Sequence, residues 1–241
     1  PVLLSAKEVS KNFGGLRVIN DLDIKVDHGQ IVGLIGPNGA GKTTMFNLLC
    51  GLYQCDAGQV TFDQKDITNM GPPHRIARLG MARTFQIVKP LGGLSVMDNV
   101  VAGAVESARN IEAAKERSLE IVRLTGLERY ADTKAASLTL AGRKRLEVAR
   151  ALATKPKLLL LDEVMAGLNP TEVDQAIELI QAVKAHGISL LVIEHVMKAI
   201  MRLADKVVVI HHGEKIFEGT PQEAGQDRNV VSAYLGKEFA Q

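Results

Sequence analysis

One stretch of the sequence combines a lysine, two threonines and three glycines in a spacing that suits phosphate binding. Residues 36–44 read GPNGAGKTT and satisfy the pattern G-x-x-x-x-G-K-[ST]. Glycines let the backbone curl so that successive N–H groups point at phosphate oxygens. Lys42 can reach the β- and γ-phosphates, and the Thr43 hydroxyl can bind magnesium. The pattern predicts a nucleotide site made of Gly36, Pro37, Asn38, Gly39, Ala40, Gly41, Lys42, Thr43 and Thr44.

The surroundings of this loop favour a nucleotide site over a chance run of glycines. The apolar run IVGLIG precedes the loop and predicts a strand, whereas TTMFNLLCGL follows it and predicts a helix ending near Gly51. This order places the phosphates at a helix N-terminus, where the helix dipole favours negative charge. A chance loop would not explain the lysine and the threonine together with both elements.

A pair of carboxylates follows the most apolar segment of the chain. Four consecutive leucines at 158–161 are typical of a strand buried on both faces of a parallel sheet, and Asp162 and Glu163 come directly after them. Ligands bind at the carboxyl ends of such strands. There, Asp162 could hold magnesium through water and Glu163 could polarise an attacking water. Helix capping is the alternative role for this pair, but the phosphate loop favours the catalytic one.

Two further polar residues are expected at the ends of strands. Gln86 follows the strand pattern MARTF, and His195 ends the pattern SLLVIEH. A lone glutamine or histidine at such a position more often makes a structural hydrogen bond. In an open parallel sheet, however, both would reach the edge where the phosphates bind, and there they could contact the γ-phosphate.

The elements around these residues predict an α/β fold with an inserted helical part. The runs LLSAKEVSKNF and LRVINDLDIKV predict N-terminal strands. Between residues 87 and 152 strand patterns stop. SVMDNVVAGA, with a capping box at Ser95 and Asp98, and IEAAKERSLEIVRLTG, with apolar residues at Ile111, Leu119, Val122 and Leu124, predict helices. We therefore predict a core of residues 1–86 and 153–241 and a helical subdomain of residues 87–152.

Composition and charge narrow the class of protein. The 241 residues are 46% hydrophobic, which suffices for a core, and carry a net charge of +2. Surfaces that bind nucleic acid are usually strongly basic, so we expect no nucleic-acid partner. Cys50 and Cys55 fit neither metal nor redox spacing, which favours a reducing compartment. Neither a secretory signal nor an apolar run of about 18 residues is found, so we expect a soluble protein that meets membranes through a partner.

Taken together, these motifs resemble the ATP-binding subunit of ABC transporters, and the resemblance covers essentially the whole chain. It implies a P-loop nucleoside triphosphatase of the ABC type, with a mostly parallel core sheet, an N-terminal antiparallel β region and the inserted helical subdomain. GPNGAGKTT is similar to Walker A, LLLLDE to Walker B, and residues 166–169 to the D-loop. The resemblance implies ATP and Mg²⁺ as cofactors. It also assigns adenine stacking or other nucleotide contacts to Phe13 and Val18, metal binding to Thr43, Gln86 and Asp162, and catalysis to Glu163, His195, Lys42 and Gln86.

The resemblance also gives a role to the segment LTLAG, residues 138–142. It stands where this family carries its LSGGQ signature at the start of a helix, so Thr139, Leu140, Ala141 and Gly142 are expected to contact the γ-phosphate bound by a second subunit. The segment departs from the family pattern: Thr139 replaces serine, Ala141 replaces glycine and Gly142 replaces glutamine. Elsewhere, Asn169 replaces the D-loop aspartate and Val164 a proline. The basic side chains at 143–145 are expected to be solvated.

Finer features resemble the branched-chain amino acid importers within this family, namely GMARTFQIVKPLGGLSVMDNV and LDEVMAGLNPTE. This resemblance implies several partners: a second ATPase subunit, identical or a sister, two membrane permease subunits and, indirectly, a periplasmic substrate-binding protein. It also implies a cytoplasmic position on the inner face of the membrane. Alternatives are a soluble ABC ATPase in a repair or assembly complex, a small-molecule P-loop kinase, and a non-hydrolysing regulator, which the presence of Glu163 disfavours.

Overall fold

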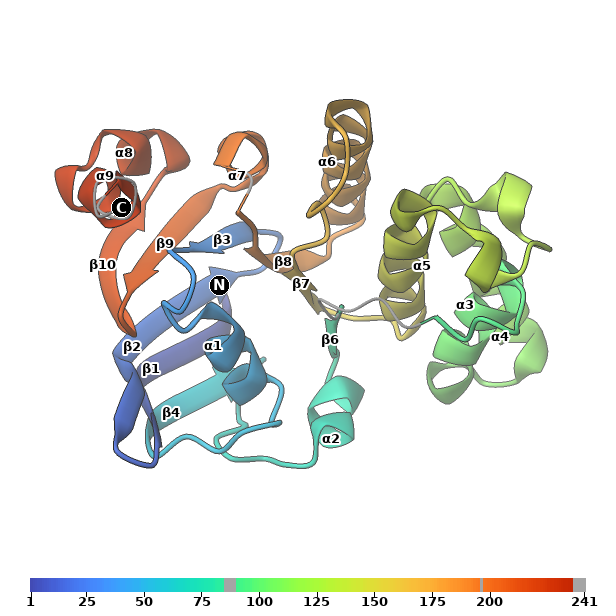
Figure 1. Ribbon diagram of the computed structural model, residues 1–241. Helices are drawn as coiled ribbons and strands as arrows, with labels where there is room; N and C mark the ends of the chain where they lie inside the picture. Colours follow the sequence, from blue (N-terminus) through green and yellow to red (C-terminus); the bar gives the residue numbers. More distant parts are fainter. Residues whose placement is uncertain (85–89, 196, 236–241) are drawn as a thin grey trace.

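The computed structural model describes residues 1–84, 90–195 and 197–235, which form two β-sheets and several helices (Figure 1). The strands are β1 (Val2–Phe13), β2 (Leu16–Asp27), β3 (Ile31–Ile35), β4 (Ala57–Phe62), β5 (Lys65–Asp66), β6 (Met81–Arg83), β7 (Leu158–Asp162), β8 (Ser189–Ile193), β9 (Lys206–His211) and β10 (Glu214–Gly219). The α-helices are α1 (Lys42–Leu49), α2 (Pro73–Arg78), α3 (Val96–Ala104), α4 (Ile111–Leu124), α5 (Leu140–Ala153), α6 (Pro170–Ala185), α7 (Met197–Leu203), α8 (Pro221–Gln226) and α9 (Arg228–Leu235). Short 3₁₀ turns cover 105–107, 128–130 and 135–137.

A six-stranded sheet forms the centre of the molecule, in the order β10-β9-β3-β8-β7-β6. The strands from β9 to β6 pair in parallel, and β10 joins the edge as an antiparallel strand. Every residue of β3, β7 and β8 is buried. Successive side chains of a strand point to opposite faces, so Leu159 and Leu161 join one core and Leu158 and Leu160 the other. The prediction of a mostly parallel core sheet is confirmed.

The second sheet is antiparallel, in the order β2-β1-β4-β5, and confirms the predicted N-terminal β region. Helix α1 lies between this sheet and the central one, as Figure 1 shows. Its Met45 and Phe46 are fully buried in the same core as Ile24 and Val60 of the antiparallel sheet. This packing fixes α1, and with it the preceding phosphate loop, between the two sheets.

Helices α3, α4 and α5 form a group beside the β6 edge of the central sheet (Figure 1). The prediction of the apolar face of α4 is partly wrong, because Ile111 and Leu119 are exposed. The face that packs inward instead carries Ala114, Ser118 and Ile121. Small residues allow close approach, and the Ser118 hydroxyl is satisfied by donating to the Ala114 carbonyl at 2.7 Å.

Two predicted strands end earlier than their sequence patterns. Strand β6 ends at Arg83, and β8 ends at Ile193, so Glu194 and His195 lie in the turn that follows β8. At the start of α3, Ser95 accepts the Asp98 N–H at 3.0 Å, as predicted for a capping residue, and its hydroxyl donates to the Asp98 carboxylate. Within the described residues, no helix is both long and apolar enough to cross a membrane.

Candidate nucleotide-binding and catalytic site

The phosphate loop joins β3 to α1 and folds around its own lysine. Lys42 is buried, and its Nζ donates to the carbonyl oxygens of Gly36 and Pro37 at 2.6 and 3.0 Å. A side chain at position 36 is excluded, because a Cβ there would lie 2.1 Å from the Ile210 carbonyl oxygen. The loop is therefore closely packed against β9, and its lysine is held inside the loop by two backbone carbonyls.

The other residues predicted to bind nucleotide lie along the same loop. Gly41 adopts φ 107°, and a Cβ at this position would lie 3.0 Å from the Val18 carbonyl oxygen, so β2 runs directly beside the loop. The loop residues differ in exposure: Asn38, Gly39 and Thr43 are exposed, Gly41 and Thr44 are half-buried, and Gly36, Pro37, Ala40 and Lys42 are buried. The exposed tip is thus available to a ligand while the base of the loop is fixed.

Phe13, the predicted adenine-stacking residue, ends β1 and is 42% exposed. Its ring meets the edge of Tyr53 with centroids 5.2 Å apart, and the Lys11 Nζ lies 5.3 Å from its centroid. Such edge-to-face and cation–π contacts favour a fixed ring orientation. Tyr53 was missed in the sequence because it lies 40 residues from Phe13 on a loop without a recognisable pattern.

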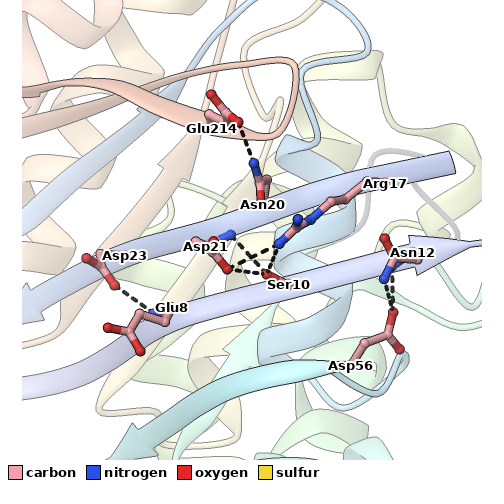
Figure 2. A network of polar contacts seen from close by, with 9 residues as sticks. All are labelled: Glu8, Ser10, Asn12, Arg17, Asn20, Asp21, Asp23, Asp56 and Glu214. Carbon is pink, nitrogen blue, oxygen red and sulfur yellow. Dashed lines mark hydrogen bonds and ion pairs between the residues drawn. The ribbon is translucent and has the colours of Figure 1, made fainter.

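Polar side chains hold the β1–β2 hairpin that carries Phe13 (Figure 2). The Asp56 carboxylate accepts from the backbone and side-chain nitrogens of Asn12 at 2.6 and 3.2 Å. Farther along the hairpin, the Ser10 hydroxyl donates to Asp21 at 2.8 Å and accepts from Arg17 at 3.2 Å. Both strands of the hairpin are therefore held by polar contacts close to the exposed ring.

Replacing Phe13 by alanine is expected to raise the dissociation constant for ATP about tenfold. Base–aromatic stacking contributes roughly 1–3 kcal/mol by alanine substitution. Titration of the purified chain with a fluorescent ATP analogue measures this. Leu16→Ala, which removes an exposed apolar side chain from the same hairpin, should leave the affinity unchanged. An equal affinity for Phe13→Ala and wild type would contradict adenine stacking by Phe13.

Asp162 ends β7 and forms a buried ion pair with Arg83 of the neighbouring strand β6. The Arg83 guanidinium donates to Asp162 Oδ2 at 2.8 Å, with side-chain exposures of 7% and 0%. Arg83 also donates to Asn47 of α1 at 2.5 Å. Within the part of the chain that the structure describes, Asp162 Oδ1 has no hydrogen-bond partner. One carboxylate oxygen is thus fixed by Arg83 and the other is left for a ligand.

The residues present fit a magnesium ion held together with nucleotide phosphates. Thr43 and Asp162 line the same cavity, of about 780 Å³, and Thr43 is exposed. Among the described residues, no three His, Cys, Asp or Glu side chains gather as a dedicated metal cage. Magnesium usually retains waters and binds one or two protein oxygens plus phosphates. Gln86, the third predicted ligand, lies outside the described residues.

The structure brings together Glu163 and His195, which are 32 residues apart in sequence. His195 Nε2 lies 2.7 Å from Glu163 Oε1. The two residues meet because β7 and β8 are parallel neighbours, with Asp162 paired to Ile193, so the segments after both strands leave the sheet at one edge. A histidine in contact with a carboxylate can orient that carboxylate as a candidate proton acceptor.

The backbone of Glu163 is in the left-handed region, with φ 51°. This conformation costs a residue other than glycine about 1–2 kcal/mol. Hydrogen bonds on both sides stabilise it: the Glu163 N–H donates to the Ile193 carbonyl at 2.9 Å, and the Glu163 carbonyl accepts from Lys144 Nζ at 2.8 Å. The catalytic candidate is thus held in a strained conformation by neighbouring elements.

Two charged residues near Glu163 and His195 are buried. One was expected to be solvated, and the other was not predicted to have a role. Lys144 was expected to be solvated but is only 8% exposed, because α5 turns it toward the end of β7. Glu194 is 1% exposed, and its Oε1 accepts the Met165 N–H at 2.8 Å. Burial raises the pKa of Glu194 to about 7, opposed by the Met165 N–H and by the charge of Lys144. Burial likewise lowers the pKa of Lys144, and the charge of Glu194 opposes this shift.

The LTLAG segment forms the N-terminus of α5. Thr139 caps the helix, since its hydroxyl accepts the Gly142 N–H at 3.2 Å, and Leu140 is the first helical residue. Thr139 and Leu140 are exposed, whereas Ala141 and Gly142 are half-buried. A helix N-terminus with a free face of this kind suits an anion. In the predicted D-loop, Asn169 caps α6 in a capping box with Glu172.

Replacing Ala141 by glycine is expected to raise the rate of ATP hydrolysis about two- to fivefold. The Ala141 methyl group lies where the family pattern has a glycine, and its removal would let the helix N-terminus approach phosphate more closely. Steady-state phosphate release measures the effect. Ala151→Gly, later in the same helix, controls for the lower helix propensity of glycine. An Ala141→Gly rate no higher than wild type would mean that this departure does not limit turnover.

The fold and the site geometry define the class of protein: a nucleotide-binding α/β protein with a phosphate loop. Comparison with known proteins identifies its family. The family model described as ABC transporter matches residues 19–166. The chain is 36% identical to the high-affinity branched-chain amino acid transport ATP-binding protein BraF of Pseudomonas aeruginosa, over 98% of each chain. It is also 36% identical to the lipopolysaccharide export system ATP-binding protein LptB of Escherichia coli, again over 98% of each.

A solved structure agrees with these relatives. The ADP conformation of MJ1267, an ATP-binding cassette of an ABC transporter, superposes with a TM-score of 0.89 at 30% identity, covering 98% of this chain and 99% of that one. The chain therefore belongs to the ABC transporter family, and it is an ATP-hydrolysing subunit of that family. The predicted fold class is confirmed.

Proposed function

We propose that this chain powers an importer of branched-chain amino acids by hydrolysing Mg²⁺–ATP between two ATPase subunits. The observation that carries the hydrolytic part is the 2.7 Å contact between Glu163 and His195 at the sheet edge that also carries Asp162. The substrate class rests on the 36% identity to BraF and on the sequence features shared with that subgroup.

In the proposed reaction, water attacks the γ-phosphorus and the Glu163 carboxylate accepts its proton, while the bond from the γ-phosphorus to the β–γ bridging oxygen breaks and ADP leaves. His195, whose Nε2 lies 2.7 Å from Glu163 Oε1, would contact the γ-phosphate, as the family resemblance implies. Lys42 and the N–H groups of the phosphate loop bind the β- and γ-phosphates. Thr43, Asp162 and, as predicted from the family, Gln86 would hold Mg²⁺, which neutralises phosphate charge when bound.

The proposed assembly is a head-to-tail dimer in which the N-terminus of α5, at Thr139–Gly142, completes the nucleotide site of the other subunit. The exposed cap at Thr139 supports this role. The second subunit is a copy of this chain or a sister ATPase. The pair would bind two permease subunits at the cytoplasmic face of the membrane, and a periplasmic binding protein would deliver substrate to them. We also propose that the chain is divided into an ATP-binding core of residues 1–86 and 153–241 and a helical subdomain of residues 87–152.

The equal identity to LptB makes lipopolysaccharide export the second candidate function. Reconstitution separates the two. The chain, purified with its permease and incorporated into proteoliposomes with the binding protein, should hydrolyse ATP faster on addition of leucine. Stimulation by lipopolysaccharide and none by leucine would reject the import proposal. Failure of the isolated chain to release phosphate from ATP at any magnesium concentration would contradict the hydrolytic part.

A further inference from the structure

The three segments that carry catalytic or signature residues meet at two buried charged side chains. Lys144 comes from α5, two residues after the LTLAG segment. Glu194 lies between the end of β8 and His195. Between them runs the segment after β7, which starts with Glu163. Neither Lys144 nor Glu194 has a part in the reaction described above, yet both are almost completely removed from water.

Lys144 acts directly on the backbone of the catalytic glutamate. Its Nζ donates to the Glu163 carbonyl at 2.8 Å, and that carbonyl also accepts the Ala166 N–H at 3.2 Å. An ammonium group donates stronger hydrogen bonds than a neutral donor does. The signature helix is thereby attached to the residue whose left-handed backbone aims the catalytic carboxylate.

Glu194 holds the next part of the same segment. Its Oε1 accepts the Met165 N–H at 2.8 Å, and within the described residues its Oε2 has no hydrogen-bond partner. Lys144 and Glu194 therefore hold the same short segment, one at the Glu163 carbonyl and the other at the Met165 N–H, and groups buried in this way are stabilised by polar or oppositely charged neighbours. Glu194 is also the immediate neighbour of His195, which contacts Glu163.

We propose that Lys144 and Glu194 are positioning residues that connect the signature helix to Glu163 and His195 of the same subunit. A displacement of α5, when its N-terminus binds the nucleotide of the other subunit, is then passed to the catalytic glutamate of its own site. Each subunit thereby connects the two nucleotide sites of the dimer: the site that its signature helix completes and the site that its own Glu163 serves. This inference rests on the proposed head-to-tail dimer.

The test uses substitutions that remove charge but retain shape. Lys144→Met retains the aliphatic stem without the ammonium, and Glu194→Gln retains an acceptor for the Met165 N–H without the carboxylate. We expect kcat for ATP hydrolysis to fall at least tenfold in each, with KM for ATP within twofold of wild type. Lys184→Met is the matched control; it removes a lysine of α6 that pairs with Asp205, and it should leave kcat unchanged.

The double variant separates positioning from simple stability. Removing one partner of a buried charged pair destabilises a protein, whereas removing both often does not. The thermal midpoint of Lys144→Met/Glu194→Gln should therefore return toward wild type, while kcat should stay as low as in the single variants. Recovery of kcat together with the thermal midpoint would overturn the proposal, and so would wild-type kcat in the single variants.

Hydrogen exchange provides a readout that does not depend on turnover. Amides of residues 163–168 should exchange faster in Lys144→Met and in the double variant than in wild type or Lys184→Met. Unchanged exchange would overturn the connection even if the isolated chain proved unable to hydrolyse ATP. Faster exchange in a chain without ATPase activity would instead leave the connection standing and reject the proposed function.

Discussion

Glu163→Gln is expected to reduce ATP hydrolysis by roughly 10²–10⁴-fold, the usual contribution of a general base. Glutamine has nearly the same shape and can still accept a hydrogen bond from His195, but it cannot take a proton from water. Nucleotide binding should be retained, because the phosphate loop is untouched. The variant should therefore accumulate with ATP bound, and size-exclusion chromatography with light scattering should show an ATP-dependent dimer that wild type forms only transiently.

The control for this experiment is Glu178→Gln, which removes an exposed carboxylate from α6 and should change neither property. A Glu163→Gln chain that hydrolyses ATP at the wild-type rate would remove Glu163 from the mechanism. A chain that binds ATP, fails to hydrolyse it and stays monomeric would point to a sister subunit as the physiological partner, and copurification with the membrane complex would identify that subunit.

Arg83→Met is expected to lower the free energy of unfolding by about 3–5 kcal/mol, because it leaves the carboxylate of Asp162 buried without its cation. The exposures of 7% and 0% show that both side chains are buried. The loss of the Asn47 contact and of the guanidinium 5.4 Å from the Phe46 ring centroid adds to the effect. Urea unfolding followed by circular dichroism measures the change.

Arg78→Met is the matched control. Arg78 pairs with Glu106 at the same distance of 2.8 Å, but both side chains are about two-thirds exposed. Exposed pairs contribute about 0–1 kcal/mol, so this variant should unfold close to wild type. Equal midpoints for the two arginine variants would show that burial of the Arg83–Asp162 pair contributes nothing to stability.

Much of the site could be predicted because its residues lie in local patterns. The glycines, lysine and threonine of the phosphate loop are consecutive, and the four leucines before Asp162 indicate a strand buried on both faces. Once the strands are known to be parallel, Glu163 and His195 must leave the sheet at one edge. Their 2.7 Å contact therefore follows from strand order, although periodicity alone does not give that order.

The remaining features depend on contacts between distant segments. Lys144 lies in the basic run RKR, and from the sequence all three residues look equally solvated. Only the packing of α5 against the segment after β7 separates Lys144 from its neighbours. Ile111 and Leu119 show the converse, since their apolar side chains face water while the smaller Ala114 and Ser118 pack inward. Arg83 is the exception that the sequence does indicate, because an arginine in a core strand requires a buried partner.

The left-handed backbone at Glu163 has a consequence for engineering this protein. Glycine adopts that conformation without the side-chain penalty, so a procedure that optimises folding alone would replace the glutamate and discard the proposed proton acceptor. Stability and activity therefore favour different residues at this one position. A library selected for heat resistance without a turnover assay should enrich glycine at position 163, and its most stable members would not hydrolyse ATP.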